Sequence, residues 1–107
     1  METLNYRFEG GQRPLSGMPQ LVGVVGSGNL EILIEPAHLK GACEIEVRTA
    51  AVGFGATWQA VMVDFHARWS LADARVSVND MGATPAVVSL RLDQAVESIA
   101  DLPGGAP

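Results

Sequence analysis

Alternation of apolar and polar residues predicts strands in the first half of the chain. In residues 4–8 and 43–48 every second side chain is apolar, which is the period of a strand with one buried face. Residues 21–25 and 30–35 are compact apolar runs of strand length. We therefore expect four early strands, and a fifth, shorter strand at residues 75–78.

A hairpin turn is predicted between the second and third of these strands. The residues that separate the two apolar runs are Gly26, Ser27, Gly28 and Asn29. Gly and Asn accept the positive backbone angles of tight turns at low cost, so this cluster is typical of a hairpin. Residues 10–17, which are rich in glycine and contain a proline, predict a loop instead.

The period of the apolar residues changes in the second half of the chain, where two helices are expected. The first is predicted over residues 57–69, with Thr57 as its N-cap. Its apolar face, at i, i+3, i+4, i+7 and i+11, consists of Trp58, Val61, Met62, Phe65 and Trp69. The second is predicted to begin with Thr84 as N-cap and Pro85 in the first helical position, where a missing N–H is harmless. Its apolar face consists of Val88, Leu92, Ala95, Val96 and Ile99.

The order of four strands, helix, strand and helix predicts an α+β fold. We expect a largely antiparallel sheet of about five strands, covered on one face by two helices in a two-layer sandwich. A length of 107 residues corresponds to one ordinary domain. We expect that domain over residues 1–101, followed by a disordered tail at residues 102–107, which are rich in Pro and Gly.

Composition and charge narrow the classes of function. Apolar residues make up 48% of the chain and charged residues 18%, which is enough hydrophobic material for a core. A net charge of -5 and seven scattered Lys and Arg residues argue against binding to nucleic acid or to an anionic membrane surface. The first ten residues lack the features of a signal peptide, and the single cysteine cannot form an internal disulfide, so we expect a cytoplasmic protein.

No residues in the sequence have the spacing of a catalytic or metal site. Cys43 lacks a Cys or His neighbour at ligand spacing and is expected to be a buried, unreactive thiol. His66 in the first helix and His38 in a loop lack a nucleophilic or acidic partner and are expected to be ordinary surface residues. The string GVVGSG at residues 23–28 is followed by neither Lys nor a helix, so it is not a phosphate loop.

Ser27 is distinguished by its place rather than by its reactivity. A serine between two glycines at a hairpin tip exposes its hydroxyl and has no bulky neighbours, so an enzyme could modify it there. Turn chemistry alone also explains this residue, because Gly, Ser and Asn predominate in turns for conformational reasons. The local pattern leaves both interpretations open.

Several stretches of the chain resemble one known family. VVGSGNLE at residues 24–31, with ILIEP after it, is similar to the modified-serine segment of the acyl carrier subunit of malonate decarboxylases. ATWQA at residues 56–60 and NDMGATPAVVSLRLDQA at residues 79–95 resemble that family's two helices and the turn before the last helix. The combined resemblance extends over residues 21–97.

The resemblance implies that the chain is a carrier subunit with no catalytic residues of its own. Ser27 would carry 2'-(5''-phosphoribosyl)-3'-dephospho-CoA through a phosphodiester link, as in the carrier subunit of citrate lyase, and Gly26, Gly28 and Asn29 would support the attachment turn. A dedicated transferase would attach this group. An acyltransferase subunit would exchange acetyl for malonyl on its thiol, and carboxylase subunits would decarboxylate the malonyl thioester.

Three positions depart from the family's usual pattern, namely Asn29, Met81 and Ala86, and two other classes of protein remain as alternatives. Asn29 occupies a position where many members have Asp, which is nearly isosteric and equally suited to turns. The Asp-Ser-Leu motif of the helical acyl carrier proteins of fatty-acid synthesis is absent from the sequence. The alternatives are a non-catalytic α+β adaptor with an unmodified Ser27, and a small stand-alone enzyme, which would require a cleft.

Overall fold

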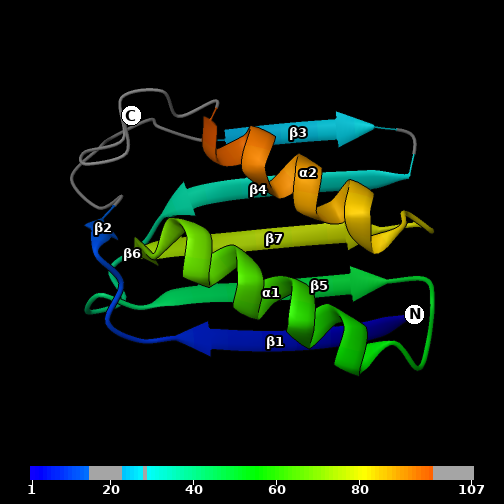
Figure 1. Cartoon of the computed structure of the whole chain (residues 1–107), viewed down its shortest axis with the longest axis horizontal. Coiled ribbons are helices and arrows are strands. Elements are labelled where there is room, and N and C mark those ends of the chain that lie inside the picture. The colour runs from blue at the N-terminus through cyan, green and yellow to red at the C-terminus, as the bar shows by residue number, and fades with distance from the viewer. Residues whose placement is uncertain (15–22, 28, 98–107) are drawn as a thin grey trace.

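The computed structural model describes residues 1–14, 23–27 (by their backbone) and 29–97 of the chain. Two helices lie across one face of a sheet, and the other face is left uncovered by them (Figure 1). The strands of the main sheet are β1 Glu2–Phe8, β3 Gly23–Ser27, β4 Leu30–Pro36, β5 Cys43–Thr49 and β7 Ala74–Asp80. The helices are α1 Gly55–Trp69 and α2 Pro85–Glu97. Two short strands, β2 Arg13–Pro14 and β6 Leu71–Ala72, pair in parallel in a separate two-stranded sheet.

The five main strands lie in the order β1-β5-β7-β4-β3. All neighbouring pairs are antiparallel except the central pair of β5 and β7, which is parallel and is connected by α1. A parallel pair requires a crossover, because the chain must return to the end of the sheet where the first strand began before the second strand can start. As a result β3, β5 and β7 finish at the same end of the sheet, at Ser27, Thr49 and Asp80, and we call this the hairpin end (Figure 1).

The core lies between the sheet and the two helices. Alternate residues of the strands face the helices and are fully buried, among them Ile32, Ile34, Ile45, Val47, Val76 and Val78. The helices contribute their predicted apolar faces, with Trp58, Met62 and Phe65 buried on α1 and Val88, Leu92, Ala95 and Val96 buried on α2. Period two in the strands and period 3.6 in the helices therefore bury the residues that the sequence indicated.

The predicted fold class, an α+β sandwich of five main strands and two helices, is confirmed. Two details of the prediction were wrong. The first helix begins at Gly55 rather than after Thr57, because its N-cap is Phe54, which makes no side-chain capping bond. The predicted loop at residues 10–17 contains the short strand β2, and its residues from 15 onward lie outside the described part of the chain. Ile99 and the predicted tail at residues 102–107 also lie outside it.

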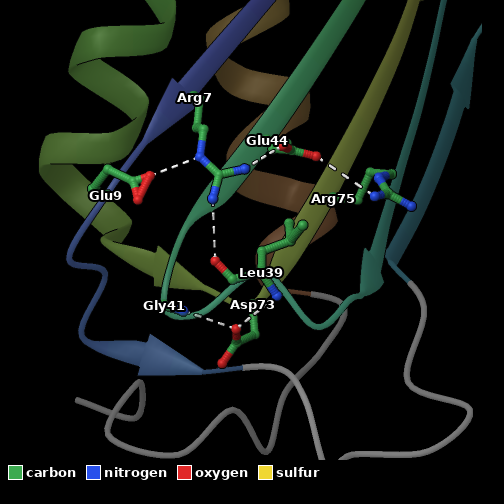
Figure 2. A network of polar contacts seen from close by, with 7 residues as sticks. All are labelled: Arg7, Glu9, Leu39, Gly41, Glu44, Asp73 and Arg75. Carbon is green, nitrogen blue, oxygen red and sulfur yellow. Dashed lines mark hydrogen bonds and ion pairs between the residues drawn. The ribbon is translucent and has the colours of Figure 1, made fainter.

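A network of ion pairs and hydrogen bonds lies at the end of the sheet opposite the hairpin end (Figure 2). The guanidinium of Arg7 binds the carboxylates of Glu9 and Glu44, and Glu44 also pairs with Arg75 at 3.5 Å. In the adjacent loop the carboxylate of Asp73 accepts hydrogen bonds from the backbone N–H groups of Leu39, at 3.1 Å, and Gly41, at 2.9 Å. These contacts join β1, β5 and β7 and fix the loop that connects β4 to β5.

Candidate functional site

The predicted hairpin is present, with a shorter turn than the sequence indicated. Strand β3 continues to Ser27, which pairs directly with Leu30 of β4, so only positions 28 and 29 lie between the paired residues. Gly26 is therefore a strand residue, opposite Glu31, rather than a turn residue. Asn29 lies in the turn and is exposed, and Gly28 is outside the described residues. Ser27 is thus the last residue of a strand at the border of the sheet.

A hydrogen bond connects the hairpin turn to the segment between β7 and α2. The backbone N–H of Met81 donates to the carbonyl of Asn29 at 2.8 Å. In the strand register Leu30 pairs with Asp80, so the first residue of β4 and the last residue of β7 are direct neighbours. The position of the hairpin is therefore coupled to the start of α2.

The segment that leads into α2 is organised by the buried carboxylate of Asp80. It accepts hydrogen bonds from the hydroxyl of Thr49 at 2.8 Å, from the N–H of Gly82 at 3.2 Å and from the N–H of Ala83 at 2.8 Å. Thr84 then caps the helix as predicted, because its hydroxyl accepts the N–H of Val87 at 3.3 Å. One side chain thus joins the end of β5, the end of β7 and the entry to α2.

A cavity of about 280 Å³ opens at the hairpin end, between the first turns of the two helices. Its wall is mostly apolar and includes Phe54, Trp58, Val61, Asp80, Ala83 and Val88. Phe54, Val52 and Met81, three of the large apolar side chains exposed at the surface, lie in the loops around this end of the molecule. An exposed apolar group of this kind beside a cavity is typical of a binding surface.

The single cysteine is buried and unreactive in character, as predicted. Cys43 is 1% exposed at the start of β5. Burial, and to a smaller extent the negative charge of Glu44, raises the pKa of the Cys43 thiol to about 12. At neutral pH this group is therefore a neutral thiol, which is a poor nucleophile and a poor metal ligand.

The two histidines differ in their surroundings. His38 is exposed, as predicted. His66 is partly buried rather than on the surface, because its ring stacks on Phe8 at a centroid distance of 4.6 Å, and burial lowers its pKa. Within the described part of the chain, no three His, Cys, Asp or Glu side chains gather in a way that could hold a metal ion. None of the helices described there is long and apolar enough to cross a membrane.

Sequence reasoning missed Asp80, Thr49 and the cavity. Thr49 and Asp80 are 31 positions apart, and no motif links them. One signal was present: Asp80 precedes Gly82 by two residues, and an Asp side chain in a turn often accepts a backbone N–H two residues further on.

Comparison with known proteins identifies relatives of the whole domain. Residues 18–99 match the family described as malonate decarboxylase delta subunit (MdcD). The malonate decarboxylase acyl carrier protein of Xanthomonas euvesicatoria pv. vesicatoria (strain 85-10) is 63% identical, over 91% of this chain and 93% of its own length. The protein of the same name from Stenotrophomonas maltophilia (strain R551-3) is 59% identical, over the full length of both chains.

A solved structure shows the same fold. One chain in the crystal structure of a Pseudomonas malonate decarboxylase hetero-tetramer in complex with malonate superimposes with a TM-score of 0.76. It is 34% identical in sequence, and the alignment covers 92% of this chain and 99% of that chain. The match of family, sequence and fold over most of the domain agrees with the hairpin and helices described above, and the chain accordingly belongs to the malonate decarboxylase delta subunit family of acyl carrier proteins.

Proposed function

We propose that this chain carries acetyl and malonyl groups as thioesters on 2'-(5''-phosphoribosyl)-3'-dephospho-CoA, attached to Ser27 through a phosphodiester. The observation that supports this assignment is the position of Ser27, the last residue of a border strand at the mouth of a hairpin, in a chain of an acyl carrier family. The attached group supplies the chemistry, since its terminal thiol holds the acyl group.

The backbone around Ser27 suits a bulky attachment. Strand β3 pairs with β4 on one side and is the last strand of the sheet, so no further strand crowds its outer side among the described residues. Gly26 and Gly28 flank the serine and have no side chains that could obstruct a modifying enzyme. The bond from Met81 to Asn29 holds the turn on the body of the protein.

The proposed contribution of the protein is to present the carried group, without catalytic residues of its own. The partners would be the acyltransferase and carboxylase subunits of malonate decarboxylase, together with the transferase that attaches the prosthetic group. The similarity to one chain of a malonate decarboxylase hetero-tetramer supports a role inside such an assembly. The buried Cys43 thiol, whose pKa is raised to about 12, is a poor nucleophile at neutral pH.

The test is the intact mass of the chain, produced together with a prosthetic-group transferase of a malonate decarboxylase system. We expect an added mass equal to the phosphoribosyl-dephospho-CoA group, on the peptide that contains Ser27. The variant Ser27→Ala should gain no mass yet melt at the same temperature, because a hydroxyl at a strand end contributes little to stability.

The matched control is Ser89→Ala on α2, which should be loaded like the unaltered protein. An unmodified Ser27, in the presence of a transferase shown to be active on a relative, would favour the adaptor instead. A large drop in the melting temperature of Ser27→Ala would indicate a structural serine.

A further inference from the structure

The cavity at the hairpin end lies close to the proposed attachment point. Ser27 is directly opposite Leu30 in β4, and Leu30 is directly opposite Asp80 in β7. Neighbouring strands are separated by about 5 Å, so position 27 is about 10 Å from the backbone of Asp80. Asp80 forms part of the cavity wall.

The two residues that follow position 27 across the sheet, Leu30 and Asp80, belong to the face that the helices cover. Residues directly opposite each other in paired strands belong to the same face. Leu30 and Asp80 are both buried, at 3% and 2% exposure, and both belong to the alternating set that faces the helices. Asp80 therefore lies on the face that the helices cover, at the end of the sheet where β3 also finishes.

The wall of the cavity suits a small neutral group rather than an anion. Among the described residues that line it there is no Lys, Arg or His, and most are apolar. Its one charged residue is Asp80, whose carboxylate is already bound by Thr49, Gly82 and Ala83. A carboxylate placed here would lose its hydration without gaining a cationic partner, and it would approach a like charge.

We propose that this cavity binds the acetyl-thioester end of the group carried on Ser27, and that it does not bind the malonyl form. The inference rests on the carrier function proposed above. It gives the protein a resting state in which the acetyl thioester is withdrawn from water, and a malonyl state in which the same arm is free to reach a partner subunit.

A weak site is sufficient for this purpose, because the ligand is tethered. A group joined by a flexible arm that reaches the site experiences an effective concentration on the order of 1 mM. A cavity with a dissociation constant of about 0.1 mM for the free acetyl end would then be occupied for roughly nine-tenths of the time. A mostly apolar wall of this size can supply such an affinity without any charged contact.

The test begins with protein whose loading on Ser27 has been verified by intact mass, in the acetyl and malonyl forms. Hydroxylamine takes the acyl group from the thioester as a hydroxamate and releases the thiol, so the rate of cleavage measures how exposed the thioester is. We expect the acetyl form to be cleaved about tenfold more slowly in the unaltered protein than in Ala83→Leu, which fills the cavity. Ala60→Leu, an exposed position on α1 outside the cavity wall, is the control and should match the unaltered protein.

Two further measurements test the cavity without relying on correct folding of Ala83→Leu. Phe54→Ala removes a rim side chain and should also accelerate cleavage of the acetyl form, because Phe54 is 53% exposed and caps α1 only through its backbone. In nuclear magnetic resonance spectra, the indole N–H of Trp58 should shift between the thiol and acetyl forms, and less between the thiol and malonyl forms.

The outcomes separate this inference from the proposed function. One result would overturn the cavity assignment and leave the carrier function intact. In that result the acetyl thioester is cleaved equally fast in the unaltered chain, Ala83→Leu and Phe54→Ala, and the Trp58 resonance does not shift. Equal protection of the acetyl and malonyl forms would overturn the discrimination. Failure to load at Ser27 would contradict the carrier function itself.

Discussion

The buried carboxylate of Asp80 connects β5 and β7 to the segment that enters α2, at the hairpin end of the sheet. Asp80 is 2% exposed and accepts three hydrogen bonds, from the end of β5 and from the segment that enters α2. Gly82 and Ala83 lie just before the cap residue Thr84, so the carboxylate fixes the loop that leads into α2.

We predict that Asp80→Ala lowers the free energy of unfolding by about 3 kcal/mol, because it leaves buried donors without an acceptor. Urea unfolding followed by circular dichroism would measure the loss. Asp64→Ala, on the exposed side of α1 with its side chain 62% accessible, should change stability by less than about 0.5 kcal/mol. Equal effects of the two substitutions would show that the Asp80 contacts contribute little.

Cys43 gives the folded protein a dependence on alkaline pH. Its pKa is about 12 in the fold, where burial is the main cause, against an ordinary value of 9.0 for the free thiol. Because the folded pKa is raised, the contribution of this group is complete below pH 9 and is lost as the pH rises toward 12.

We expect the unaltered protein to lose stability relative to Cys43→Ala over that interval, by up to about 1.4 kcal/mol per pH unit. The comparison should be made on the form without prosthetic group, by urea unfolding at pH 8, 10 and 11. The same protein should resist alkylation at pH 8 until urea is added. Rapid alkylation of the native form would show that the thiol is accessible.

The sequence revealed residues whose role depends on their neighbours in the chain. Thr84 was predicted as a cap because Pro85 follows it, and its hydroxyl does accept the N–H of Val87. Ser27 was singled out by its two flanking glycines. Asp80 could not be identified with equal certainty, because its hydroxyl partner, Thr49, comes from a different strand and is brought near only by the pairing of β5 with β7.

Among the elements, α1 contributes the largest fully buried side chain of the core, Phe65. Its apolar residues recur with the period of a helix, which allowed the face to be predicted from the sequence. The start of the helix was missed because Phe54 caps it without a side-chain bond, so no characteristic residue marks the boundary.

We predict that Phe65→Ala costs about 3 to 5 kcal/mol of stability, since it opens a cavity in the centre of the core. Thermal or urea unfolding would detect this change. Val63→Ala, on the same helix but 49% exposed, is the control and should cost less than about 1 kcal/mol. A loss of under 1 kcal/mol for Phe65→Ala would contradict the central place of this ring.

Short elements escaped prediction for a different reason. Strands β2 and β6 contain two residues each, which is too few to display any period. The parallel pairing of β5 with β7 was also not foreseen, because alternation identifies strands but does not specify their neighbours. The helix between these strands is nevertheless the connection that a parallel pair requires.

At the scale of the whole molecule, the two ends of the sheet have different roles. One end contains the hairpin, the starts of both helices and the cavity, whereas the other contains the polar network of Arg7, Glu44 and Asp73 (Figures 1 and 2). This division predicts that substitutions can change the stability of the protein without changing attachment of the prosthetic group to Ser27.

We predict that Asp73→Ala lowers the free energy of unfolding by about 2 kcal/mol, because the N–H groups of Leu39 and Gly41 lose their acceptor. Below its melting temperature, the variant should still gain the prosthetic group at the rate of the unaltered protein. Glu9→Ala, at the same end but 67% exposed, is the control for stability. Slower loading of folded Asp73→Ala would show that the two ends are coupled.

The directions of the first strand and the last helix have a practical consequence for handling this protein. β1 begins at Glu2, which pairs with Thr49 at the hairpin end, whereas α2 starts beside Asp80 and runs about 20 Å toward the opposite end before Glu97. An affinity tag ahead of Glu2 would leave the protein at the hairpin end, where we propose that the modifying enzyme acts, although at the border of the sheet opposite to β3. Purification handles, fluorescent labels and surface tethers at the amino terminus should therefore be removed before attachment of the prosthetic group is measured.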